Sequence, residues 1–204
     1  MLNPKLDVRI DIVTGLVAPA EQRPSPNHDT RPPGCAIDLL VLHGISLPPG
    51  TFGGPWVDRL FNNRLDPDAH PYFQEIAHLR VSCHLLVDRE GALIQYVPLH
   101  RRAWHAGRST HRGRSDCNDF SIGVELEGTD EQPYTEAQYR VLDRLLPALV
   151  TAYPAITADR IVGHCDIAPD RKTDPGPCFD WRRVRQALNR DRAGYSERPA
   201  GKAD

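Results

Sequence analysis

The residues of this 204-residue chain that can do chemistry are concentrated in three short stretches. They are HGISLPPG at 43–50, GVELEGT at 123–129 and GHCDIAPDRKTDPG at 163–176. A hydrolytic zinc site takes three protein ligands from histidine and carboxylate side chains and keeps one position open. His43, His164 and Asp174 can supply such a set, and imidazole donors favour zinc over magnesium or calcium. These residue types therefore predict one zinc ion per chain.

Both candidate histidines follow apolar runs that are typical of strands. Residues 36–42 indicate a strand buried on both faces, and it ends at His43 because the LPPG at 47–50 cannot continue it. Residues 161–163 indicate a shorter strand that delivers His164 to a loop. Strand ends are where an α/β sheet usually carries its site, so we expect the two imidazoles to lie there.

Glu125 belongs to a third predicted strand, over residues 121–126. Alternation along this strand places its apolar residues on one face and Ser121, Gly123 and Glu125 on the other. Because serine and glycine are small, the pattern predicts open space beside the carboxylate.

The remaining pattern predicts one mixed α/β domain over residues 1–189, with a central mixed β-sheet flanked by helices. The expected elements are an irregular proline-rich wrap over 1–35, a helix over 55–62, a hairpin of 82–87 with 92–97, a helix from Thr135 with a capping box to Gln138, and a helix over 181–189 capped by Asp180. Pro147 is expected to kink or end the helix that begins at Thr135. Residues 190–204 are expected to form a polar, frayed tail.

The overall composition excludes several classes of protein. The formal net charge is -2 and no basic cluster is present, which argues against a nucleic-acid partner. No apolar run approaches the roughly 20 residues that span a bilayer. The start MLNPKLDVRIDIVTG lacks the pattern of a secretory signal, so a cytoplasmic location is expected.

The five cysteines are odd in number and form no C-x-x-C pair: Cys35, Cys83, Cys117, Cys165 and Cys178. They are expected to be reduced thiols, because a secreted domain of this size would more often carry an even disulfide framework. Cys165 directly follows His164 and could compete for zinc. Adjacent residues on extended backbone point in opposite directions, which favours Asp174 as the third ligand.

Five ordered stretches carry a resemblance to a known family. They are HGISLPPG, AHLRVSCH, RAWHAG, CNDFSIGVELEGTD and GHCDIAPDRKTDPGP. Together they resemble the AmpD family of cytoplasmic 1,6-anhydro-N-acetylmuramyl-L-alanine amidases, which belongs with the bacteriophage T7-type amidases and the peptidoglycan recognition proteins. The resemblance covers about residues 24–187. It implies a central mixed sheet flanked by helices and makes His43, His164 and Asp174 the zinc ligands.

The same resemblance makes Glu125 and Lys172 the catalytic pair. Amide hydrolysis requires a water to lose a proton and a tetrahedral oxyanion to be stabilised. Glu125 is then the general base. Lys172, two residues before Asp174, brings a positive charge to the developing oxyanion.

Four further residues are expected to contact the substrate. Tyr72 would orient it, Arg80 would bind a peptide carboxylate in two-point fashion, and Trp104 with His105 would line the groove.

Two positions depart from the family pattern. Gly44 stands where enterobacterial members usually carry Asn, and Asp116 stands where they tend to carry Arg. The resemblance places both positions at substrate contacts, so substrate affinity and peptide preference stay open while the metal ligands are retained.

The resemblance implies a monomeric enzyme that hydrolyses the lactyl–L-alanine amide bond of soluble 1,6-anhydromuropeptides during cell-wall recycling. In the family this reaction also lowers the muropeptide signal that induces β-lactamase. Two other functions remain open: a non-catalytic muropeptide-binding protein, and an amidase that acts on intact peptidoglycan outside the membrane. The retained ligands together with Glu125 and Lys172 disfavour the first, and the missing signal peptide disfavours the second.

Overall fold

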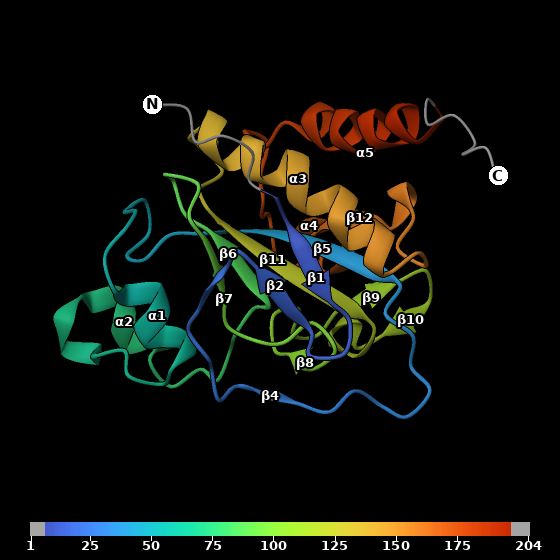
Figure 1. Cartoon of the computed structure of the whole chain (residues 1–204). Helices are drawn as coiled ribbons and strands as arrows, with labels where there is room; N and C mark the ends of the chain where they lie inside the picture. Colours follow the sequence, from blue (N-terminus) through green and yellow to red (C-terminus); the bar gives the residue numbers. More distant parts are fainter. Residues whose placement is uncertain (1–6, 197–204) are drawn as a thin grey trace, which may run out of the picture.

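A six-stranded mixed sheet forms the centre of the protein, as expected from the sequence (Figure 1). The computed structural model describes residues 7–196, with side chains described as far as Asn189. In spatial order the strands are β12 (Ile161–Gly163), β5 (Leu39–Ile45), β11 (Ser121–Glu127), β6 (Leu85–Val87), β7 (Leu93–Gln95) and β3 (Glu21–Gln22). The first four are parallel, β6 and β7 are antiparallel, and β3 is parallel to β7.

The two longest strands, β5 and β11, lie side by side and carry the chemistry. All seven residues of β11 are buried, so this strand is covered on both faces. Parallel pairing places His43 directly opposite Glu125. The same register pairs Ile45 with Glu127, so β5 continues two residues beyond the end predicted at His43.

One face of the sheet is covered by α3 (Glu136–Ala152), on which α5 (Trp181–Ser196) packs in turn (Figure 1). The predicted capping box is confirmed: the Thr135 hydroxyl accepts from the Gln138 backbone N–H, and the Gln138 side chain accepts from the Thr135 N–H. Leucines of α3 meet the apolar faces of β5 and β11 in the main core. The helix continues through Pro147 to Ala152, so the predicted early end is wrong. Burial of the leucine stripe stabilises the helix on both sides of the proline.

The opposite face is covered by shorter elements. They include α1 (Trp56–Phe61), α2 (Pro71–Ile76), β8 (Arg102–Ala103), η2 (Cys117–Asp119) and α4 (His164–Ile167). The remaining short elements are η1 (Pro67–Ala69), β9 (Thr110–His111), β10 (Arg114–Ser115) and η3 (Ala158–Arg160). The helix predicted over 55–62 is α1, with Pro55 at its N-cap. Phe61 and Phe73 pack with Leu86 in a second apolar cluster. His43 and Glu125 lie on this same face of the sheet, between the second apolar cluster and a third one around Cys117.

The N-terminal segment is more regular than the sequence indicates. β1 (Arg9–Asp11) and β2 (Leu16–Ala18) form an antiparallel hairpin, and β4 (His28–Asp29) pairs with β8. The Asp11 carboxylate accepts from the backbone of Val13, and Gly15 adopts a φ of 69° that suits glycine. This turn chemistry was not recognised in the sequence, so the expectation of irregular structure is wrong for these short strands, while residues 1–6 lie outside the described part of the chain.

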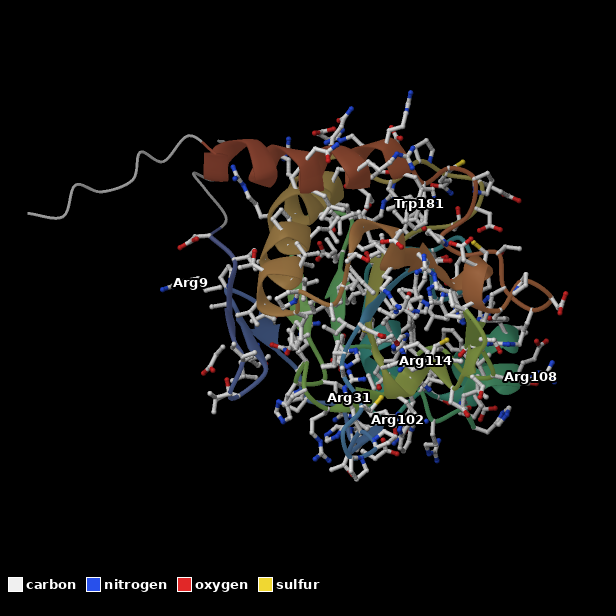
Figure 2. All side chains as sticks on the ribbon, turned by 90° about the vertical axis from the view of Figure 1, so that its right-hand side faces the viewer. Arg9, Arg31, Arg102, Arg108, Arg114 and Trp181 are labelled. Carbon is white, nitrogen blue, oxygen red and sulfur yellow. The ribbon has the colours of Figure 1, made fainter. Side chains whose placement is uncertain are left out.

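Arg31 fastens this segment to the rest of the domain. Its guanidinium donates to the backbone carbonyls of Leu99, Asn118 and Ser121. Burial lowers the pKa of Arg31 to about 10. Arg31 and Arg102 lie in the same lower part of the molecule in Figure 2, whereas Arg9 points away from the body.

The C-terminal elements also differ from the prediction. His164 begins the short helix α4 rather than a loop, because the Asp166 carboxylate accepts from the Gly163 N–H and starts a turn. The Asp180 carboxylate accepts from the Arg182 N–H, which confirms the predicted cap of α5. This helix runs to Ser196, past the predicted boundary at 189, since no proline occurs before Pro199. The rest of the predicted tail, 197–204, lies outside the described residues.

All five cysteines are free thiols, as expected. Within residues 7–196, no helix is long and apolar enough to cross a membrane.

Candidate metal centre

Three side chains that are distant in sequence meet on the face of the sheet opposite α3. Nδ1 of His43 lies 3.0 Å from Nδ1 of His164, and each nitrogen lies 3.2 Å from Oδ2 of Asp174. Both imidazoles are almost completely buried, and Asp174 is partly exposed. The predicted His-His-Asp set is therefore assembled in space.

The spacing of these donors suits a small tetrahedral cation. Ligands bound at about 2.0–2.1 Å to a tetrahedral zinc ion lie ~3.3 Å from one another. The three observed separations of 3.0, 3.2 and 3.2 Å are close to that value. Two imidazoles and one carboxylate are also the donor types of hydrolytic zinc sites, which leave the fourth position free.

The charge states of the cluster suit a cation as well. Burial lowers the pKa of His43 to about 4, so this imidazole is neutral near pH 7 and offers a lone pair. Burial alone would raise the pKa of Asp174, but its close contacts with the imidazoles of His164 and His43 outweigh it and hold that pKa well below its usual range. Asp174 is therefore a carboxylate.

The ring nitrogens on the far side of the two histidines have partners inside the protein. Nε2 of His164 lies 3.2 Å from the carbonyl oxygen of Ala106. Nε2 of His43 lies 2.9 Å from Nδ1 of His105, whose own Nε2 lies 3.1 Å from the hydroxyl of Ser121. These contacts hold both rings with Nδ1 directed at Asp174.

The loop that carries Asp174 is tied down at several points. The backbone carbonyl oxygen of Asp174 accepts from the Cys165 N–H, and the neighbouring Pro175 carbonyl accepts from the Tyr134 hydroxyl at 2.9 Å. Cys165 lies in a helix, so the extended-backbone argument against it does not apply. Among the described residues, the group that can hold a metal contains Asp174 and not Cys165.

Glu125 lies beside the cluster, with Oε1 4.0 Å from Nδ1 of His43. Burial, reinforced by the charge of Asp174, raises the pKa of Glu125 well above its usual range, and the charge of Lys172 opposes this. Oε2 of Glu125 is buried without a hydrogen-bond partner in the described part of the chain. A buried carboxylate oxygen without a partner is costly, and such groups occur at reactive sites.

Lys172 reaches the same region from the loop after α4. Its backbone N–H donates to the Ala168 carbonyl, and its side chain is half-buried. The charge of Lys172 acts on both Glu125 and His43. The structure thus brings the predicted catalytic pair and the predicted ligands into one region.

The four residues predicted to contact the substrate differ in how exposed they are. Tyr72 is half-buried against the second apolar cluster. Arg80 is exposed and donates only long hydrogen bonds to nearby carbonyls, including that of Leu79. Trp104 is half-buried, and its Nε1 is a buried donor without a partner in the described residues. His105 is only 8% exposed and both its ring nitrogens have protein partners, which favours a place behind the metal cluster over one in the groove.

Three residues of this region were missed in the sequence: Ser121, Gly123 and Tyr134 as supports of the site. The period-two pattern had placed Ser121 and Gly123 on the face of Glu125, but it left the space beside them empty. The His105 ring fills that space: a Cβ on Gly123 would lie 2.4–2.7 Å from three of its atoms. Nothing in the sequence spacing links residue 105 to residue 123.

The backbone and neighbours of Gly44 and Asp116, the two positions that depart from the family pattern, limit which side chains fit there. A Cβ on Gly44 would lie 2.3 Å from the hydroxyl oxygen of Tyr134, so a side chain here requires that ring to move. Asp116 has left-handed backbone, with a φ of 58°, immediately before η2. Asparagine and aspartate tolerate this conformation better than arginine does.

Comparison with known proteins defines the class to which this fold and site belong. Residues 33–177 match the family model of N-acetylmuramoyl-L-alanine amidase. This range includes all three residues of the metal cluster together with Glu125 and Lys172.

Several curated relatives narrow the class. The 1,6-anhydro-N-acetylmuramyl-L-alanine amidase AmpD of Salmonella typhimurium strain SL1344 is 60% identical over 171 residues, which are 84% of this chain and 91% of the relative. AmpD of Escherichia coli K12 is 58% identical over 177 residues, or 87% and 96% of the two chains. The chain belongs to the N-acetylmuramoyl-L-alanine amidase family, and within that family it groups with the AmpD amidases.

Solved structures agree with this placement. The crystal structure of a selenomethionine AmpD derivative superposes with a TM-score of 0.84 at 58% identity, covering 88% of this chain and 98% of the other. A complex of E. coli AmiD with the substrate anhydro-N-acetylmuramic acid-L-Ala-D-gamma-Glu-L-Lys matches with a TM-score of 0.54 at 26% identity, covering 96% and 74%.

Proposed function

We propose that this protein is a zinc-dependent amidase that cleaves the bond between the lactyl group of 1,6-anhydro-N-acetylmuramic acid and the L-alanine of the attached peptide. The observation that carries the proposal is the convergence of His43, His164 and Asp174 beside the buried carboxylate of Glu125. The curated AmpD relatives, named for this amidase activity, support the choice of substrate.

His43, His164 and Asp174 would hold the ion through two nitrogens and one oxygen. Zinc in such a site supplies a Lewis acid, which polarises an amide carbonyl and makes water more acidic near neutral pH. Among the described residues three such donors converge, which is the ligand number of catalytic zinc sites that keep one position for water or substrate.

Glu125 acts as the general base in this proposal. Burial raises its pKa, which makes the carboxylate a stronger base towards water, and the proton that it accepts can then pass to the leaving amine. Lys172 places a positive charge where the carbonyl oxygen becomes an oxyanion. Both side chains lie close enough to His43 to interact with it electrostatically.

Recognition of the rest of the substrate is assigned to side chains around the cluster. Arg80 is free to turn towards a peptide carboxylate because it is exposed. The unpartnered indole N–H of Trp104 is a donor suited to a substrate carbonyl or hydroxyl. Tyr72 would orient the substrate from α2.

We place this reaction in cell-wall recycling, with soluble 1,6-anhydromuropeptides as substrates in the cytoplasm and the protein acting as a monomer. AmiD has been captured with an anhydromuropeptide of this kind, and AmpDH3 of Pseudomonas aeruginosa with an anhydromuramic pentapeptide. A consequence would be a lower level of the muropeptides that induce β-lactamase.

Mass spectrometry of anhydromuramyl-tripeptide after incubation with the protein tests the proposal. Free tripeptide and free anhydro sugar are expected with zinc present, and intact substrate is expected after chelation. Substrate left intact by the zinc-replete protein would contradict the enzyme assignment and favour a binding protein. Release of soluble peptides from intact peptidoglycan, without cleavage of the tripeptide substrate, would instead favour a wall-degrading amidase.

A further inference from the structure

A chain of three hydrogen bonds runs from the candidate ligand His43 into the protein interior. His43 Nε2 lies 2.9 Å from His105 Nδ1, and His105 Nε2 lies 3.1 Å from Ser121 Oγ. Ser121 Oγ lies 2.6 Å from the backbone carbonyl oxygen of Cys117. Ser121 is fully buried and His105 nearly so, so water cannot replace these partners easily.

The carbonyl at the end of this chain fixes the position of every proton in it. A carbonyl oxygen only accepts, so the Ser121 hydroxyl must donate to Cys117 across the short 2.6 Å contact. The Ser121 oxygen then accepts from His105, which places the His105 proton on Nε2. A neutral His105 accepts at Nδ1, so the proton of His43 lies on Nε2 and its Nδ1 carries the lone pair.

The second candidate ligand, His164, takes the same Nε2–H tautomer through a direct contact with a backbone carbonyl. Nε2 of His164 lies 3.2 Å from the Ala106 carbonyl, which also accepts from Arg171 at 2.7 Å. The Ala106 carbonyl is closer to this nitrogen than the Arg171 guanidinium, which lies 3.5 Å away, so His164 donates from Nε2 to the carbonyl and leaves Nδ1 free towards Asp174. Both imidazoles are prepared in the tautomer that a metal ion requires, one by a carbonyl directly and the other through His105 and Ser121.

Strand β11 leaves room for the His105 ring beside Ser121. Gly123 lies two residues from Ser121 on the same face, and its N–H donates to His84. A Cβ at Gly123 would lie within 2.4–2.7 Å of three His105 ring atoms, so the ring occupies the place of the missing side chain.

We propose that His105 and Ser121 are positioning residues that set the tautomer and ring orientation of His43 for metal binding. The inference rests on the proposed role of His43 as a zinc ligand. Loss of a hydrogen-bond partner behind a metal-binding histidine typically costs about 10- to 100-fold in metal affinity. Without the Ser121 acceptor, His105 is free to carry its proton on Nδ1, which would place the His43 proton on the nitrogen that faces the metal.

Two measurements on Ser121→Ala test this. Two-bond ¹H–¹⁵N correlation spectra of histidine-labelled, metal-free protein report which nitrogen of each ring is protonated. We expect His43 and His105 both in the Nε2–H form in the parent protein, and a population with the proton on Nδ1 in Ser121→Ala. Zinc affinity, measured by competition with a chromophoric chelator, is expected to fall about 10-fold or more.

Matched variants separate positioning from general loss of structure. Ser121→Thr keeps the hydroxyl and should retain the parent tautomer and most of the affinity. Ser25→Ala also removes a fully buried hydroxyl that donates to a backbone carbonyl, that of Phe61, and should change neither reading. Gly123→Ala keeps both polar partners but displaces the His105 ring, so it should lower zinc affinity as well.

The outcomes are distinct. A parent protein with the His43 proton on Nδ1, or a Ser121→Ala variant with unchanged tautomers and unchanged zinc affinity, overturns the inference. A parent protein with the expected tautomers that fails to bind zinc overturns the proposed zinc site instead, because the spectra are recorded without metal.

Discussion

Glu125 shows how a strand can hold a buried carboxyl group with one oxygen left without a hydrogen-bond partner in the described part of the chain. Its neighbours on the same face of β11 are Ser121 and Gly123, whose small size admits the His105 ring. Its own Oε2 is left without a hydrogen bond in the described residues, and burial raises its pKa. Burying this side chain costs folding free energy, a feature that is common among residues of active sites.

Glu125→Gln tests the general-base role. The amide keeps the size of the side chain but cannot accept the proton, so kcat/KM for the anhydromuramyl peptide should fall by about 10²- to 10⁴-fold. Zinc content should be unchanged, because Glu125 is not among the three clustered donors. Steady-state kinetics with metal analysis checks both. A loss smaller than tenfold would assign the proton transfer to another group.

Lys172→Ala tests electrostatic stabilisation of the oxyanion. Removal of one such donor typically costs about 10²- to 10³-fold in kcat, and KM should change less. Lys172→Arg serves as the control, since it keeps the positive charge and should recover part of the rate. Equal losses in both variants would show that the charge itself is not what matters.

At the scale of single residues, the sequence predicted that His43, His164 and Asp174 lie together, because zinc chemistry and the family resemblance restrict the residue types strongly. The structure brings His43, His164, Asp174, Glu125 and Lys172 together, and their roles stay predictions until tested. The support given by Ser121 could not be predicted. Its partner His105 comes from a different segment, and no local pattern reveals a hydrogen bond across the fold.

Helix α3 stabilises the sheet through polar contacts at its N-terminus as well as through its buried leucines. The Gln138 side chain is fully buried and donates to the carbonyls of Val87 and Glu127, at the ends of β6 and β11. The Thr135 hydroxyl also donates to the Arg89 carbonyl. The N-terminus of this helix therefore fastens the strand that holds Glu125 to its neighbour.

Gln138→Ala should lower the free energy of unfolding by roughly 2–4 kcal/mol, because it leaves buried carbonyls and one backbone N–H without partners. Urea unfolding followed by circular dichroism measures this. Gln186→Ala on α5 is the matched control, since that side chain is exposed and the change should stay within ~0.5 kcal/mol. Equal midpoints for the two variants would contradict the role of Gln138.

Elements with strong local signals were predicted and those set by long-range pairing were not. The cap of α3 and the β6–β7 hairpin follow from Thr135, Gln138 and the DREG turn. The short strands β3 and β4 pair with β7 and β8, far along the chain, whereas the local β1–β2 hairpin was missed because its turn chemistry was not recognised. The extra two residues of β5 likewise come from its register with β11 and not from its own composition.

The whole molecule is a layered domain in which α5, α3 and the sheet follow one another (Figure 1). The cluster of His43, His164 and Asp174 lies on the face of the sheet opposite α3. The cluster joins β5 to the loop after α4, two segments separated by more than half of the chain. An ion held there would link those segments, so its binding should stabilise the entire domain.

Chelation should therefore lower thermal stability. Zinc at a hundredfold excess over its Kd stabilises the folded state by about 2.7 kcal/mol. For a domain of this size the loss of that term corresponds to a Tm lower by roughly 5–10 °C. Differential scanning fluorimetry with and without chelator measures the shift. Asp174→Ala should show the low Tm in both conditions, and a parent protein with the same Tm in both would contradict tight zinc binding.

The pairing of His43 with Glu125 across β5 and β11 also limits how such chains can change length during evolution. Side chains alternate along a strand, so one inserted or deleted residue within β11 before position 125 would turn the carboxylate towards the leucines of α3. Length changes should instead occur outside the strands, for example at 129–133, where the chain leaves the sheet before α3 begins. A library of single-residue deletions, selected for amidase activity, should therefore tolerate gaps in that connection and reject them between 121 and 125.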